Sequence, residues 1–119
     1  MDKLTSTYRR RILKATLDRH QRKNGSNLIV ISLPKGGITT LELTEVLMDG
    51  LLCRFEKLAV SEYGSVNGEK SIRELYQNSL DVNGRGEYLT EGGKLLVDDL
   101  IAEVVTHVKN NSAIIQEKQ

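Results

Sequence analysis

The sequence has few of the residues on which many metal-binding, disulfide-linked and membrane-spanning proteins depend. It contains one cysteine, one proline, one phenylalanine, two histidines and no tryptophan in 119 residues. The single Cys53 excludes an internal disulfide, and His20 and His107 lie too far from it in the sequence to form a recognisable metal motif. No apolar run approaches the roughly 18 residues of a membrane span, and no signal-peptide segment is visible at the start. We therefore expect a cytoplasmic protein that binds no membrane, metal or cofactor.

Catalytic groupings are equally scarce. No serine–histidine–aspartate arrangement can be placed, and the neighbouring Asp98 and Asp99 are typical of the solvated face of a helix. Residues 35–37, Lys-Gly-Gly after an apolar run, are similar to the phosphate loop of ParA-like ATPases. However, no lysine precedes Thr39 to reach the phosphates of a nucleotide. The sequence predicts a turn at this position and a protein that is not an enzyme.

What the sequence does contain is ordinary for a globular protein. Hydrophobic residues make up 39% of the chain and charged residues 28%, and the rarity of aromatics means that the core must be aliphatic. The length suits one domain that can bury a core without metals or disulfides. We expect this domain to cover residues 1–110 and residues 111–119 to form a flexible tail.

Charge is distributed unevenly along the chain. Residues 1–25 hold eight lysines and arginines against two aspartates, although the net charge of the whole chain is only +1. A basic segment of this kind can face a polyanion such as nucleic acid, or it can be the solvated side of an amphipathic helix. The sequence leaves both interpretations open.

The first half of the chain predicts a helix, a strand and a helical region. Apolar residues recur at helical spacing over 5–23, and Gly25 suits the left-handed position after a helix. Residues 28–33 form a short β-branched run, which predicts a strand buried on both faces. Thr39 and Glu42 fit a capping box, so a helix is expected from there to about residue 63. Gly50 either separates two helices or lies inside one long helix.

The second half contains two Asn-Gly pairs, at residues 67–68 and 83–84. Because Asn-Gly is a strong hairpin signal, residues 55–66, 69–82 and 85–90 could form a three-stranded meander. Helical spacing within 68–78 favours a helix there and leaves one hairpin, at Asn83-Gly84, with Val82 and Tyr88 as cross-strand partners. Thr90 is the expected cap of a last helix, which should stop at residues 110–112.

The stretch 80–97 resembles part of the MarR- and PadR-type winged-helix regulators, in which a wing strand reading Tyr-x-Leu-Thr-Glu-x-Gly leads into a helix. This chain has one residue fewer between the tyrosine and the leucine. The residues that carry the resemblance are Arg85, Tyr88, Leu89, Thr90, Glu91, Gly93, Lys94, Leu95 and Leu96. The resemblance implies an α+β fold of winged helix-turn-helix type, in the order helix, strand, helix, helix, hairpin, helix.

In such a fold, a helix before the wing enters the major groove of DNA and the wing tip contacts the backbone or minor groove. The reading helix would be 50–63 or 68–78, and neither is strongly basic, so the basic first helix could supply further phosphate contacts. The predicted DNA-binding residues are Arg9, Arg10, Arg11, Lys14, Arg54, Lys57, Lys70, Arg73 and Arg85.

The last helix carries a wide apolar stripe, which can pack on the first helix or pair with a second copy. A winged helix with a long Val-rich last helix is typically a dimer, with two reading heads one duplex turn apart. The predicted dimer interface consists of Leu96, Leu100, Ile101, Val104, Val105 and Val108.

The sequence therefore predicts a homodimeric transcriptional regulator that binds double-stranded DNA. The alternative is a protein–protein interaction module of mixed α/β fold that binds no nucleic acid.

Overall fold

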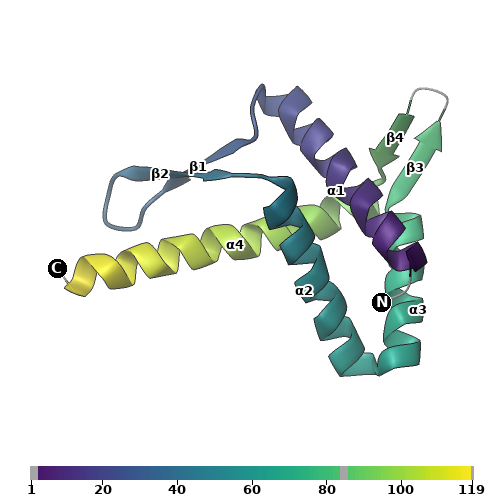
Figure 1. The fold of residues 1–119 in the computed structure, drawn as a ribbon. Helices are drawn as coiled ribbons and strands as arrows, with labels where there is room; N and C mark the ends of the chain where they lie inside the picture. Colours follow the sequence, from purple (N-terminus) through teal and green to yellow (C-terminus); the bar gives the residue numbers. More distant parts are fainter. Residues whose placement is uncertain (1–2, 84–85, 119) are drawn as a thin grey trace.

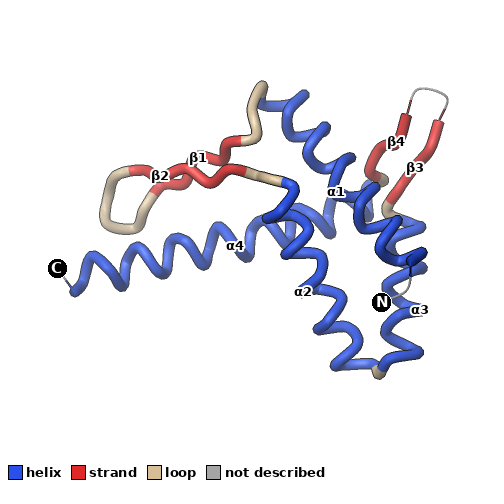
Figure 2. The backbone as a smooth tube through the Cα atoms, viewed as in Figure 1, coloured by secondary structure: helices blue, strands red, loops and turns tan. Residues whose placement is uncertain are grey.

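The computed structural model describes residues 3–83 and 86–118, with side chains described for residues 4–81 and 87–111. The described residues form four helices and two separate two-stranded antiparallel sheets, so the expected α+β class is confirmed (Figures 1 and 2). The elements are α1 (Lys3–Asn24), β1 (Leu28–Ser32), β2 (Ile38–Glu42), α2 (Glu45–Tyr63), α3 (Ser65–Asn78), β3 (Leu80–Asn83), β4 (Gly86–Leu89) and α4 (Glu91–Lys118).

Helix α1 matches the predicted first helix and ends where expected. The amide of Gly25 donates to the carbonyl of Gln21 at 2.8 Å, and Gly25 has a φ of 74°. This left-handed conformation costs a glycine little and a residue with a Cβ more, so Gly25 stops the helix.

The segment after α1 differs from the prediction. β1 pairs with β2 in a hairpin, with Leu28 opposite Glu42 and Ser32 opposite Ile38, so residues 38–42 are a strand and the capping box at Thr39 is wrong. β-branched residues at 38–40 favour a strand, and pairing with β1 satisfies their backbone groups. The loop at residues 33–37 closes on itself, because the amide of Leu33 donates to Gly37 O and the amide of Gly36 donates to Leu33 O, and β2 follows it directly.

The expectation that β1 is buried on both faces is also wrong. Ile31 is buried and Ile29 half-buried on one face, whereas Leu28 and Val30 are exposed on the other. Only one further strand pairs with β1, and only one face of the hairpin is packed; in Figure 1 that hairpin runs beside the C-terminal half of α4.

Helix α2 begins later than predicted and is continuous through Gly50. The side chain of Thr44 accepts a hydrogen bond from the amide of Leu47 at 3.0 Å, which caps the first turn. The helix ends at Gly64, whose φ of 86° excludes helical continuation. The break between the two helices is therefore at Gly64, and the option of a turn at Gly50 is wrong.

Helix α3 overturns the alternative of a three-stranded meander, because residues 65–78 are helical and the first Asn-Gly pair lies inside the helix. Gly68 is buried against α2: a Cβ at this position would lie 2.8 Å from the Cα of Val60. This approach of two helix backbones has no room for a side chain, which explains a glycine where helix propensity alone disfavours it.

The second Asn-Gly pair does fold the chain back, since β3 and β4 pair antiparallel. The register places Asp81 opposite Tyr88 and Val82 opposite Glu87, so the predicted pairing of Val82 with Tyr88 is wrong by one residue. Thr90 then caps α4 as expected, because its Oγ1 accepts from the amide of Gly93 at 3.1 Å. The stop predicted at residues 110–112 is wrong, since α4 is helical to Lys118.

The core lies where α1, α2, α3 and the first half of α4 meet. It is aliphatic with one aromatic anchor, as expected from the composition: Tyr76 is fully buried, and its ring centroid is 6.5 Å from that of Phe55. The buried members of this core are Ile12, Leu13, Ala15, Leu43, Met48, Leu52, Ile72, Tyr76, Leu89, Val97 and Leu100. None of the helices in the described ranges has the length and apolar character to cross a bilayer.

Candidate nucleic-acid interface

The most distinctive local arrangement is the pair α2 and α3, which one residue separates. The amide of Gly64 donates to Val60 O at 2.9 Å, and the amide of Gly68 donates to Gly64 O at 2.8 Å. These bonds close the turn, and Gly68 lets the second helix lie directly against the first. The result is a closely packed pair of helices joined by a one-residue turn, followed after one residue by the β3–β4 hairpin (Figure 1).

Helix α3 presents one polar stripe to solvent. Its apolar side, with Ile72 and Tyr76, is buried in the core. Polar residues on the opposite side recur at intervals of three and four, which places them on one face together with the exposed Val66: Asn67, Lys70, Ser71, Glu74 and Asn78. Amide, hydroxyl and ammonium groups are the donors and acceptors that read base edges.

The β3–β4 hairpin projects from the end of α3 (Figure 1). Two hydrogen bonds from Thr90 hold the base of the hairpin in place. The amide of Thr90 donates to Ser79 O at 3.0 Å, and its Oγ1 donates to Asn78 O at 2.7 Å. The predicted tip cation, Arg85, lies outside the described residues. Arg11, another predicted DNA-binding residue, forms an ion pair with Glu87 of β4 at 2.8 Å. Its charge is therefore neutralised within the domain.

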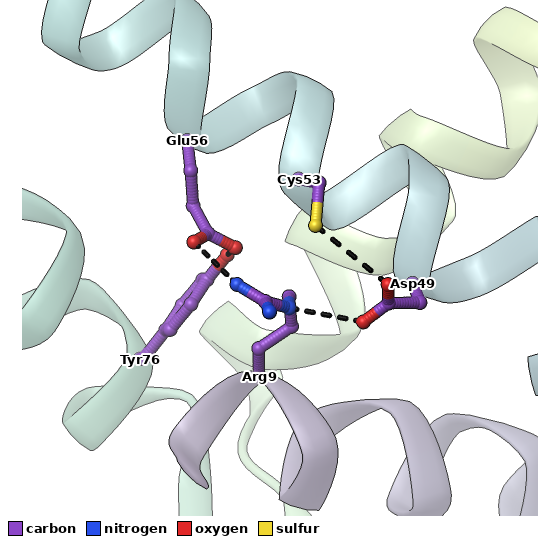
Figure 3. Close-up of polar contacts among 5 residues, drawn as sticks. All are labelled: Arg9, Asp49, Cys53, Glu56 and Tyr76. Atoms are coloured by element: carbon purple, nitrogen blue, oxygen red, sulfur yellow. Dashed lines mark hydrogen bonds and ion pairs between the residues drawn. The ribbon is translucent and has the colours of Figure 1, made fainter. Parts of the chain in front are cut away.

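Arg9, another predicted DNA contact, is held between two helices (Figure 3). Its Nη1 donates to Glu56 Oε1 at 2.7 Å and its Nε to Asp49 Oδ1 at 3.0 Å. Tyr76 Oη donates to the other oxygen of Glu56 at 3.0 Å. The Arg9–Glu56–Tyr76 network therefore joins α1, α2 and α3, and the Arg9 guanidinium serves the packing of the domain.

Glu56 is the buried centre of this network. Burial raises the pKa of its carboxyl, while the hydrogen bond from Tyr76 and the charge of Arg9 lower it, and the pKa stays above its ordinary value. The pKa of Tyr76 is raised by burial and by the adjacent carboxylate. The hydrogen bonds from Arg9 and Tyr76 offset the cost of burying the Glu56 carboxylate. Removal of either donor would leave one of its oxygens without a hydrogen bond.

Cys53 lies one turn from Glu56 on the same helix. Its Sγ is 3.7 Å from Asp49 Oδ2, and burial raises the pKa of the thiol. This is the environment of a protonated cysteine rather than of an activated nucleophile. The described residues contain no group of three His, Cys, Asp or Glu side chains that could hold a metal ion.

The other predicted cations are spread over several surfaces. Arg10 and Lys14 lie beside the start of α2, next to Glu45 and Asp49. Lys57 lines a groove of about 710 Å³ between α1, α2 and α3.

Two more predicted cations lie on α2 and α3. Arg54 faces Asp99 and Glu103 across a groove between α2 and α4. Arg73 is half-buried on α3, and Lys70 is the predicted cation that lies on the exposed stripe of that helix. The structure therefore does not gather the predicted residues into one basic surface.

The six predicted dimer residues fall into two groups along α4. Leu100 is buried, and Leu96 and Ile101 pack partly against the domain's own core. Val104, Val105 and Val108 are half-buried, on the second half of α4, which extends beyond the core (Figure 1).

One group of cations was not predicted as a site. Arg19, Arg22 and Lys23 of α1 and Lys94 of α4 line a groove of about 430 Å³ beside Tyr88 of β4. The three α1 residues were visible as part of the basic N-terminal segment, but their proximity to Lys94 depends on how α4 packs. We call these four side chains and Tyr88 the basic groove.

In comparisons with protein-family models, with curated proteins and with solved structures, nothing matches this chain.

Proposed function

We propose that this protein binds double-stranded DNA as a winged-helix regulator, with α3 as the reading helix and the β3–β4 hairpin as the wing. The observation that carries the proposal is the unbroken succession of α2, the turn at Gly64, α3 and a hairpin, all packed on α1. A helix pair of this kind presents its second helix to the major groove, while a hairpin next to it reaches the backbone.

The side chains of α3 support this assignment. The exposed Asn67, Lys70 and Ser71 can hydrogen-bond to base edges, and the exposed Val66 lies beside them, one turn before Lys70. Lys70 and Glu74 share the polar stripe, so α3 itself adds little net positive charge. Affinity for the phosphate backbone therefore requires cations outside α3.

The proposal includes a homodimer formed through α4. This helix has 28 residues and is about 42 Å long at 1.5 Å per residue, and its second half lies beyond the core. Val104, Val105 and Val108 are half-buried there, and Val30 and Ile38 on the outer face of the neighbouring hairpin are 64% and 69% exposed. A second copy, related by a two-fold axis, would cover the valines of α4 and place two α3 helices on successive major grooves.

The first test is a gel-shift titration of the full chain with duplex DNA of random sequence at low and high salt. We expect binding at low salt that weakens as salt rises, because phosphate contacts release counterions. Lys70→Ala should weaken binding several-fold. Lys14→Ala removes the same charge from an exposed position beside acidic residues and should change binding less.

Two outcomes would contradict the proposal. Equal effects of Lys70→Ala and Lys14→Ala would remove α3 as the reading helix. If the wild-type chain does not bind duplex DNA even at low salt, the alternative of a protein-interaction module is favoured.

A further inference from the structure

The basic groove is formed by three elements that are remote in sequence. The last turns of α1, strand β4 and the first turn of α4 meet there, and Ala15 and Leu89 form a buried apolar floor. The groove therefore has walls that packing holds in position, in contrast to lysines scattered over an open surface.

The charges of this groove are only partly compensated. Arg19 forms an ion pair with Asp98 at 3.1 Å, and Lys94 forms one with Glu91 at 3.0 Å. Among the described side chains, no carboxylate pairs with Arg22 or Lys23. Two exposed cations in adjacent positions thus remain available to an anion.

Two neighbours fix the position of the Arg22 side chain. Its guanidinium carbon lies 5.3 Å from the centroid of the Tyr88 ring, and its Nε is 3.3 Å from Asp18 O. The bond to Asp18 O uses Nε, so the two terminal NH₂ groups of the guanidinium remain for a ligand, and a planar fork of donors matches two oxygens of a phosphate.

We infer that the basic groove binds phosphate groups of the DNA backbone beside the wing, with Arg22 and Lys23 as the contacting side chains. This inference rests on the proposed function and supplies the cations that α3 lacks. Tyr88 belongs to β4, so the groove lies at the base of the proposed wing. A duplex whose backbone contacts the wing would also pass this groove.

The test measures how duplex binding depends on salt, from about 50 to 200 mM, for the wild-type chain and two double variants. Arg22→Ala/Lys23→Ala removes the two available cations. Arg10→Ala/Lys14→Ala is the matched control, since it removes the same charge from exposed positions of the same helix. Circular dichroism before and after heating checks that both variants fold.

We expect the slope of log affinity against log salt to become shallower by about 2 in Arg22→Ala/Lys23→Ala, because two phosphate contacts are lost. The control double variant should keep the wild-type slope.

Three results would overturn the inference, and they are distinguishable. If the wild-type chain binds but both double variants have the same slope, the basic groove does not contact the backbone, although DNA binding stands. If the wild-type chain does not bind at low salt, the proposed function fails and the inference fails with it. The third result uses inorganic phosphate at constant ionic strength: if millimolar phosphate binds the wild-type chain but leaves duplex binding unchanged, the groove is a small-anion site and does not contact the backbone.

Discussion

Arg9 illustrates how the position of a single residue in the fold determines its role. In the sequence it belongs to an Arg-Arg-Arg run that suggests contact with a polyanion. In the structure its guanidinium bonds to Asp49 and Glu56, and its side chain is only 18% exposed. Arg10, its neighbour in sequence, points to a different surface because successive helical residues are about 100° apart. Arg9 and Arg10 therefore do not share a surface, although they are adjacent in the sequence.

Tyr76→Phe is the prediction that tests this network at the residue scale. The variant removes one of the two donors to the buried Glu56 carboxylate, and we expect a loss of about 1–3 kcal/mol in the free energy of unfolding at pH 7. Urea denaturation measures it. Tyr63→Phe is the control, because Tyr63 is 56% exposed and should change stability little.

The same variant has an expected pH dependence. The pKa of Glu56 in the folded protein is already above its ordinary value of 4.5, and loss of the Tyr76 hydrogen bond, which lowers it, would raise it further. A raised pKa means that stability is present at low pH and lost as pH rises through the folded pKa. The deficit of Tyr76→Phe should therefore shrink as pH falls from 7 towards 4.5. A constant deficit would show that Glu56 does not respond to this hydrogen bond.

At the scale of elements, the packing of α2 against α3 depends on one glycine. In Gly68→Ala the new Cβ would lie 2.8 Å from Val60 Cα and 3.0 Å from Ala59 O, so the helices must separate. We expect a loss of about 1–3 kcal/mol, despite the better helix propensity of alanine.

Gly50→Ala is the matched control, since nothing lies within 4 Å of its Cβ position inside α2. It should raise the free energy of unfolding by about 0.5–1 kcal/mol. Changes of opposite sign in the free energy of unfolding, measured by thermal or urea unfolding, would establish the close approach of α2 and α3 at Gly68. The same sign for both would contradict it.

At the scale of the whole molecule, the main feature is the second half of α4, which extends beyond the core. The chain extends over 47 × 37 × 21 Å, and α4 contributes much of that length (Figure 1). Its valines continue the core-facing stripe past the end of the core. A second copy would remove them from water, which contributes about 25 cal/mol per Å² of apolar surface buried.

Val108→Asp tests the dimer. A charge at this position would be desolvated in the interface, so we expect the mass measured by light scattering to fall from that of a dimer to that of a monomer. Duplex affinity should fall with it, because only one α3 remains per complex. Asn110→Asp introduces the same charge at an exposed position nearby and should leave the dimer intact. A wild-type chain that is monomeric at high concentration would exclude this interface.

Local signals in the sequence determined much of this structure. Helical spacing and Gly25 placed α1, the second Asn-Gly pair placed a hairpin, and Thr90 placed the start of α4, because each depends on neighbours within a few residues. The same kind of local signal was misleading at Thr39 and Asn67, where a strand partner or a helix contact outweighed it.

Tertiary structure alone decided the roles of the charged and apolar side chains. Whether Arg9 or Arg22 is available to an anion depends on carboxylates and a tyrosine that lie more than 25 residues away in the sequence. The basic groove exists only because α4 packs its first turn against α1. A periodic pattern shows which side of a helix is apolar, but the free energy of burial and ion pairing is set by the partner that the fold brings to that side.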